Sequence, residues 1–180
     1  MLELVYETHS LSTDNEDGIA TGWLPGALSD EGRRLARELG DRRRDVAAVF
    51  ASDLGRAVET AELAFARSDV PVFLDWRLRE CDYGELNGAH ADEVASARLL
   101  HVLVPYPGGE SLHDVVARME SFLHDVSARW DGLRICVVSH SANRWALQHL
   151  LEGRDLADVA AEPFAWREGW EFRVPRSAGA

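Results

Sequence analysis

The sequence predicts a three-layer α/β/α fold with a mostly parallel central sheet. Short apolar runs that are typical of buried strands alternate with longer segments whose apolar residues recur at helical spacing. This alternation favours a parallel sheet with helices on both faces. Two of the runs, residues 2–8 and 133–139, end directly before His9 and His140. Because ligands bind at the carboxyl ends of strands in such sheets, both imidazoles are expected in one crevice.

The order of elements follows from these runs and from the polar residues between them. Strands are expected at residues 2–8, 46–51, 70–74, 133–139 and 166–174. Helices are expected after an N-cap at Ser29, after Ser52-Asp53 to about residue 67, and over residues 92–103, 111–130 and 142–151. Residues 9–28 and 75–90 read as polar loops, and residues 105–109 break the chain.

Length and composition favour one folded unit. The chain has 180 residues, of which 46% are hydrophobic, so residues 1–180 are expected to form a single domain, with 175–180 as a disordered tail. No stretch approaches the roughly 20 apolar residues of a membrane helix, and no basic leader with an apolar core precedes the first strand. We therefore expect a cytoplasmic protein with no membrane partner.

The charge pattern excludes several kinds of site. A formal net charge of −12 argues against nucleic acid as a partner. Every basic residue is Arg, which excludes lysine chemistry but leaves two-point binding of phosphate by Arg. No metal-binding motif appears, and Cys81 and Cys136 do not form a C-x-x-C pair, so we expect no metal, no cofactor and no disulfide.

Polar residues at strand ends and in loops are candidate site residues, although each has a simpler reading. Arg56 follows a predicted strand near a helix start, where anions bind, but it could be a surface residue. Glu80 lies in a loop with Gly84, where a carboxyl group can act as a general acid or simply be solvated. Ser12 and Asn15 can donate to an oxyanion, yet both are also ordinary turn residues.

Together these segments resemble the histidine phosphatase superfamily, the phosphoglycerate-mutase-like proteins, from about Leu2 to Gly153. Residues 8–15 stand where that family has Arg-His-Gly-Glu-Ser/Thr-x-x-Asn. Further matches in the family's order carry the resemblance: the segments 22–23 and 28–32, the helix start at 52–61, the acidic loop at 78–88, the Pro-Gly-Gly-Glu-Ser turn at 107–111, and the strand and histidine at 137–140.

The resemblance implies roles for four residues. His9 would be the nucleophile that takes a phosphoryl group, and Glu80 would protonate the leaving oxygen and then activate water. His140 and Arg56 would bind the transferring phosphoryl group. The substrate class implied is a small phosphorylated metabolite, with no metal or other cofactor.

The chain departs from the family pattern at three positions near the histidines. Thr8 replaces the family's Arg, and Ser10 and Ser141 replace glycines. Loss of one charge-assisted contact, about 1.5–3 kcal/mol, would slow phosphoryl transfer about ten- to hundredfold or more. The two serines could add donors to a phosphate site, to which Thr8, Ser12 and Asn15 would also contribute, or they could narrow it.

Two main hypotheses follow. The first is a phosphomonoester hydrolase that acts through a phosphohistidine, slowed or specialised for its substrate by Thr8. The alternative is a non-catalytic protein of the same fold that binds a phosphate ligand or a partner. A serine hydrolase using Ser139 or Ser141 is weakly supported, because the flanking glycines of a nucleophile elbow are missing. The substrate and the oligomeric state, including a homodimer, stay open.

Overall fold

A five-stranded sheet forms the centre of the computed structural model, which describes residues 1–176. The strand order is β4-β3-β6-β1-β7, and all neighbours are parallel except β7, which runs antiparallel to β1. The bounds are β1 Leu2–Thr8, β3 Ala48–Ala51, β4 Val72–Leu74, β6 Arg134–Ser139 and β7 Trp170–Val174. The predicted fold class, a mostly parallel sheet between helices, is confirmed.

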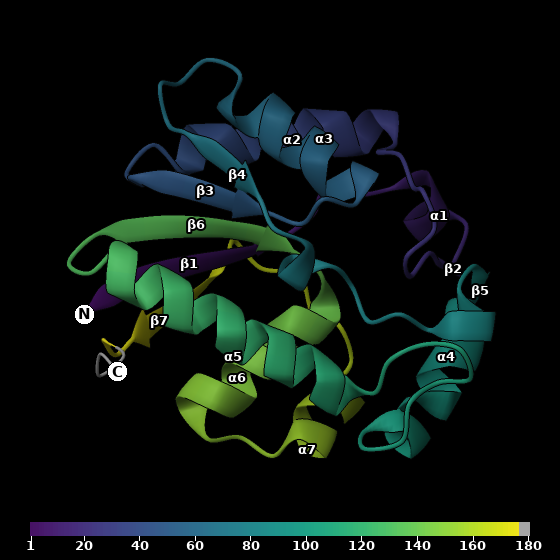
Figure 1. The fold of residues 1–180 in the computed structure, drawn as a ribbon. Helices are drawn as coiled ribbons and strands as arrows, with labels where there is room; N and C mark the ends of the chain where they lie inside the picture. The colour runs from purple at the N-terminus through teal and green to yellow at the C-terminus, as the bar shows by residue number, and fades with distance from the viewer. Residues whose placement is uncertain (177–180) are drawn as a thin grey trace.

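Helices cover both faces of this sheet (Figure 1). One face carries α2 (Asp30–Arg42) and α3 (Gly55–Phe65), and the other carries α5 (Leu112–Arg129) and α6 (Ser141–Glu152), with α7 (Leu156–Ala161) packed beside α6. Side chains of β1 alternate between the two layers, because successive residues of a strand point to opposite faces. Leu4 and Tyr6 lie in the core under α5 and α6, whereas Val5 packs in the core under α2 and α3.

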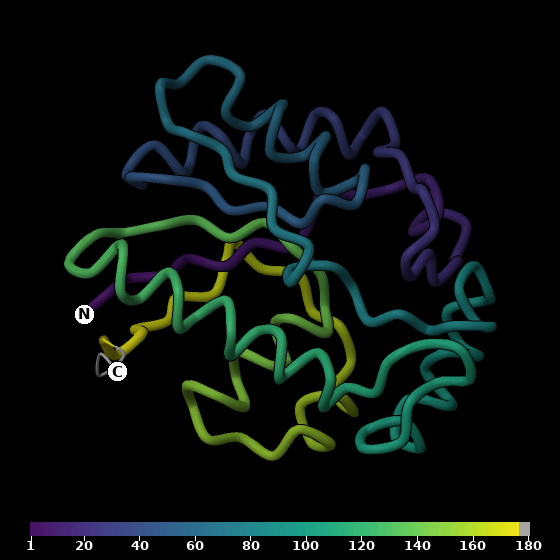
Figure 2. Tube along the Cα trace, in the orientation of Figure 1, coloured from purple at the N-terminus to yellow at the C-terminus, as the bar shows by residue number. Residues whose placement is uncertain are grey.

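A second sheet of two short strands lies beside the central sheet. The chain after β1 forms α1 (Thr13–Glu16) and β2 (Ile19–Ala20), and β2 pairs with β5 (Ala89–His90), which directly precedes α4 (Ala91–Ala97). The tube in Figure 2 shows how this pairing brings the purple segment after β1 against the teal segment before α4. These two segments carry several of the site residues predicted from the sequence.

Of the two helix N-caps predicted from the sequence, one is confirmed. The Ser29 hydroxyl accepts from the Gly32 N–H at 3.1 Å, which confirms the predicted N-cap of α2. Ser52 and Asp53 do not cap α3, whose N-cap is Leu54 without a side-chain hydrogen bond. The Ser52 hydroxyl instead accepts from the Leu54 N–H, and the Asp53 carboxylate pairs with Arg79 at 2.7 Å.

Other boundaries differ from the sequence prediction where elements are very short. Residues 9–28 are not all loop, since they hold α1 and β2. The predicted helix at 92–103 divides into α4 and a 3₁₀ turn, η3 (Arg98–His101), and two further 3₁₀ turns, η1 (Trp76–Leu78) and η2 (Gly84–Leu86), lie in the polar segment before it. The last strand begins at Trp170 instead of 166, and α7 was not predicted.

The end of the chain closes the sheet at its β7 edge. Leu2 lies opposite Val174, so the first and last strands are neighbours. Of the predicted tail, Pro175 and Arg176 follow β7 outside any helix or strand, and residues 177–180 lie outside the described residues. Within residues 1–176, none of the helices combines the length and apolar character needed to cross a membrane.

Candidate active site

The two histidines meet because β1 and β6 are parallel neighbours in register. Thr8 lies opposite Ser139, and the His9 N–H donates to the Ser139 carbonyl at 2.8 Å. The next residue of each strand is therefore a histidine, and the two ring centroids are 5.0 Å apart. Both rings line a cavity of about 990 Å³ at the carboxyl ends of these strands.

His9 presents one ring nitrogen to this cavity. Its Nδ1 lies 2.7 Å from the Ser10 carbonyl oxygen, which accepts a hydrogen bond only if Nδ1 carries the proton. The Nε2 atom then holds a lone pair, and it accepts from Arg56 Nε at 3.3 Å. Loss of solvation in the cavity, followed by the Arg56 charge, lowers the pKa of His9 to about 3. At neutral pH the ring is uncharged and Nε2 is nucleophilic.

Arg56 is fixed beside His9 by the loop that follows β2. It is the second residue of α3 and only 2% exposed. Its Nη2 donates to the Gly22 carbonyl at 2.8 Å. Gly22 has φ +55°, and a Cβ there would lie 1.8 Å from the Asn87 side-chain oxygen. The position therefore requires glycine, and it holds the carbonyl that orients the guanidinium.

His140 is buried without an evident protein partner. It is 1% exposed, and neither ring nitrogen makes a hydrogen bond to any of the described residues. Burial, then the charge of Arg56, lowers its pKa well below the ordinary value. Buried polar atoms are nearly always satisfied in native proteins, so the free nitrogens of this cavity-lining ring are suited to a polar ligand.

The Glu80 carboxylate lies at the start of α6 and completes the group. Its Oε1 accepts from the Cys81 N–H at 2.8 Å and from the Ala142 N–H at 3.2 Å, and its Oε2 accepts from the Ser141 N–H at 3.2 Å. Free N–H groups at a helix N-terminus favour an anion, which explains the position of this carboxylate. Glu80 lines the same cavity as both histidines and Arg56.

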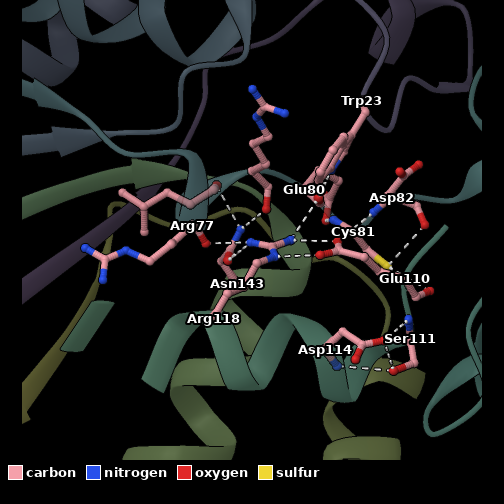
Figure 3. A network of polar contacts seen from close by, with 12 residues as sticks. Trp23, Arg77, Glu80, Cys81, Asp82, Glu110, Ser111, Asp114, Arg118 and Asn143 are labelled. Atoms are coloured by element: carbon pink, nitrogen blue, oxygen red, sulfur yellow. Dashed lines mark hydrogen bonds and ion pairs between the residues drawn. The ribbon is translucent and has the colours of Figure 1, made fainter. Parts of the chain in front are cut away.

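A buried polar network supports the backbone around Glu80 (Figure 3). Arg118 on α5 donates to the Glu80 carbonyl at 3.0 Å, to the Arg77 carbonyl at 2.5 Å and to both carboxylate oxygens of Glu110. Asn143 on α6 accepts from Arg118 and donates to the Arg79 carbonyl at 2.7 Å. The network holds the loop that carries Glu80 against α5 and α6.

Sequence reasoning missed Arg118 and Asn143. The sequence did hold a signal for the ion pair between Glu110 and Arg118. Glu110 belongs to the Pro-Gly-Gly-Glu-Ser turn, and Arg118 is a basic residue eight positions later on a predicted helix. Trp23 was noted only as part of a motif, and its Nε1 donates to the Glu80 carbonyl at 2.7 Å.

The predicted small polar residues divide into two groups. The Ser12 hydroxyl accepts from the Asn15 N–H at 3.1 Å, and the Asn15 side-chain oxygen accepts from the Ser12 N–H at 3.2 Å, so the pair forms the capping box of α1. Asn15 lines the cavity, but Ser12 is fully buried away from it. The Ser10 hydroxyl lines the cavity and donates to the Gly32 carbonyl at 2.7 Å.

Thr8 and Ser141 lie on the cavity wall, and no described cation takes the place of the missing arginine beside His9. Thr8 makes no side-chain hydrogen bond within residues 1–176, and Ser141 contributes its N–H to Glu80. Arg42 and Arg98 also line the cavity. However, Arg56 is the cation whose charge depresses the pKa of His9, whereas Arg42 acts on the Glu7 carboxylate.

The described part of the chain contains no group of three or more His, Cys, Asp or Glu side chains arranged to hold a metal ion. The charges in the cavity come from arginine and glutamate side chains. What the arrangement offers chemically is an uncharged imidazole nucleophile, a second neutral imidazole, one guanidinium and one carboxyl group around the same space.

The chain matches known proteins over most of its length. Residues 8–165 match the model of the histidine phosphatase superfamily (branch 1). A 2,3-bisphosphoglycerate-dependent phosphoglycerate mutase of Methylobacterium sp. (strain 4-46) is 35% identical over 170 residues, which cover 83% of this chain and 80% of the relative.

Solved structures show the same fold. Bacillus stearothermophilus YhfR superimposes with a TM-score of 0.86 at 24% identity and covers 98% of this chain and 96% of its own. A mycobacterial glucosyl-3-phosphoglycerate phosphatase, solved as a complex with VO₃, gives a TM-score of 0.78 at 26% identity, over 88% of this chain and 86% of its own.

Proposed function

Because the chain belongs to the histidine phosphatase superfamily, we propose that it hydrolyses phosphomonoesters of a small metabolite through a phosphohistidine on His9. The single observation that carries the proposal is the pair of neutral imidazoles, 5.0 Å apart, in a cavity with Arg56 and Glu80. Relatives named as a phosphoglycerate mutase and as a phosphatase support phosphoryl transfer in general.

In the first step the lone pair of His9 Nε2 attacks phosphorus. The P–N bond forms, the bond from phosphorus to the ester oxygen breaks, and the Glu80 carboxyl group gives its proton to that oxygen. Arg56 Nε, which donates to Nε2 in the structure, donates to a phosphoryl oxygen instead. His140 lies beside this group and offers a ring N–H to a second oxygen.

In the second step water replaces the histidine. The water oxygen attacks phosphorus, the Glu80 carboxylate takes a water proton, and the P–N bond breaks to release inorganic phosphate. His9 returns to its neutral form with the proton on Nδ1, held by the Ser10 carbonyl at 2.7 Å. Glu80 is thus the acid of the first step and the base of the second.

Thr8 favours a second candidate function, a protein that binds a phosphate ligand without turning it over. Among the described residues, Arg56 is the arginine that contacts His9, so one guanidinium stabilises the transferring group, and Arg56 can still bind an anion. The retained His9, Glu80 and His140 oppose this candidate, because a binding site needs neither a nucleophile nor an acid.

The test is release of inorganic phosphate from a panel of phosphomonoesters, with 3-phosphoglycerate included in a separate mutase assay. Wild type and a His9→Ala variant are compared, and each is checked for folding by circular dichroism. We expect wild type to release phosphate and the variant to release none. Ligand binding without turnover by folded wild type would establish the binding-protein candidate, and isomerisation faster than hydrolysis would establish a mutase.

We propose that the chain acts in the cytoplasm. Cys81 and Cys136 are both buried free thiols, which is compatible with a reducing compartment.

A further inference from the structure

The cavity extends well beyond the space that one phosphoryl group fills. Its volume of about 990 Å³ lies at the upper end of pockets that enclose drug-sized ligands, roughly 300–1,000 Å³. The histidines, Arg56 and Glu80 line only one part of it. The remaining wall must therefore contact the alcohol portion of the ester, if the proposed reaction occurs here.

Large apolar side chains form much of that remaining wall. Leu99 on η3 is 51% exposed, and Phe164 and Trp166, in the segment between α7 and β7, are 55% and 59% exposed. Val94 and Trp145 also line this wall, but their side chains are almost fully buried. Exposed apolar side chains that gather on the wall of one cavity mark a binding surface better than scattered ones do.

The three arginines of the wall differ in their partners. Arg56 is assigned to the phosphoryl group. The Arg98 guanidinium lies 4.8 Å from the Trp145 ring centroid and donates to the Ala160 carbonyl at 2.9 Å. Arg42 makes no ion pair within residues 1–176, and the Nε atoms of Arg42 and Arg98 are buried without a hydrogen-bond partner among the described residues.

Carboxylates line the same wall. Five glutamates line the cavity beside three arginines, and the chain as a whole carries a net charge of −12. Three of the glutamates have arginine partners of their own: Glu7 with Arg43, Glu38 with Arg34 and Glu162 with Arg154. These pairings leave Arg42 and Arg98 without a carboxylate partner among the described residues.

From the apolar part of this wall we infer that the subsite takes an apolar alcohol group, so that preferred substrates are aryl or longer alkyl phosphomonoesters. Phosphoglycerates, whose alcohol portion is short and polar, should then bind more weakly than these esters. The inference rests on the proposed function in one respect, since it places the phosphoryl group of the ligand at His9.

The test measures binding separately from turnover. Ethyl-, butyl- and hexylphosphonate, which cannot be hydrolysed, are titrated into wild type by calorimetry, with 3-phosphoglycerate as the polar comparison. Each buried methylene is expected to lower Kd by up to about fourfold, the factor that corresponds to about 0.8 kcal/mol. Phosphate release from the matching phosphate esters is followed in parallel.

Two wall variants and one control locate the effect. Leu99→Ser and Phe164→Ala should each raise Kd for hexylphosphonate about three- to tenfold and leave Kd for ethylphosphonate unchanged. Leu103→Ala is the matched control, because Leu103 is 73% exposed near η3 but does not line the cavity. That variant should bind both ligands like wild type.

The outcomes separate the subsite from the reaction. A Kd that does not fall with chain length, a gradient that survives both wall variants, or tighter binding of 3-phosphoglycerate than of hexylphosphonate overturns the subsite. A gradient that is lost in the wall variants, without hydrolysis of any ester, supports the subsite and overturns the proposed phosphatase activity.

Discussion

Replacement of Thr8 by arginine should increase turnover. Thr8 ends β1 on the cavity wall, and its side chain makes no hydrogen bond that the substitution would break among residues 1–176. An arginine there adds a second guanidinium near the transferring group. One charge-assisted contact contributes about 1.5–3 kcal/mol. If that contact forms mainly in the transition state, kcat rises about ten- to 150-fold.

The same substitution should have a cost in the free protein. Two guanidinium groups at an assumed separation of about 6 Å repel by roughly 3 kcal/mol at an effective dielectric constant near 20. The Thr8→Arg variant should therefore melt at a lower temperature than wild type. Inorganic phosphate should raise the melting temperature of the variant by more than it raises that of wild type. Thr8→Met is the control, since it adds length without charge.

The assay is steady-state hydrolysis of one aryl phosphomonoester near pH 7, with circular dichroism as the folding check. A folded Thr8→Arg variant whose kcat equals or falls below that of wild type refutes the reasoning. In that case Thr8 belongs to a site that is shaped for a particular substrate. Specialisation for that substrate then explains the missing arginine better than a simple loss of activity does. An equal gain in Thr8→Met would show that charge is not the cause.

Four further predictions concern the same site. Label from a phosphate ester, quenched without acid, should be found on His9, and label on His140 alone would overturn the assignment of the nucleophile. Activity should survive a chelator, and its loss followed by rescue with a stoichiometric metal would contradict this. Because burial lowers the pKa of His9 to about 3, the unfolded chain binds more protons between about pH 3 and 6.5, so the free energy of unfolding should fall as pH falls through that window, and less steeply in His9→Gln. Arg118→Met should lower kcat more than it raises KM, because it loosens the backbone of Glu80, and an unchanged kcat in a folded variant would exclude this positioning role.

The fold was predictable because its long elements carry clear periodicities. The stripe of α5 and the apolar runs of β1 and β6 specify both layers and the sheet between them. The short elements were not predictable in the same way, since the two residues of β2 cannot show a period. The helix α7 had a signal that was overlooked: Asp155 accepts from the N–H groups of Ala157 and Asp158 as an N-cap.

For the candidate site, sequence reasoning named the four groups that meet around the cavity, but it could not assign every polar neighbour. A Ser-x-x-Asn pattern fits a phosphate site and a capping box equally well, and Ser12 with Asn15 forms the capping box. Arg118 was not identified: its ion pair with Glu110 had a signal in the sequence, but its contacts with the backbone carbonyls of Arg77 and Glu80 carry no side-chain signature.

The position of Glu80 connects substrate binding with the supply of the catalytic proton. Its carboxylate occupies the N–H groups of Ser141 and Ala142 at the start of α6, in the cavity that the phosphoryl group must enter. Two anions in one poorly solvated space repel, and the repulsion is relieved when one of them is protonated. A carboxyl group that holds this proton is the form that can protonate the leaving oxygen.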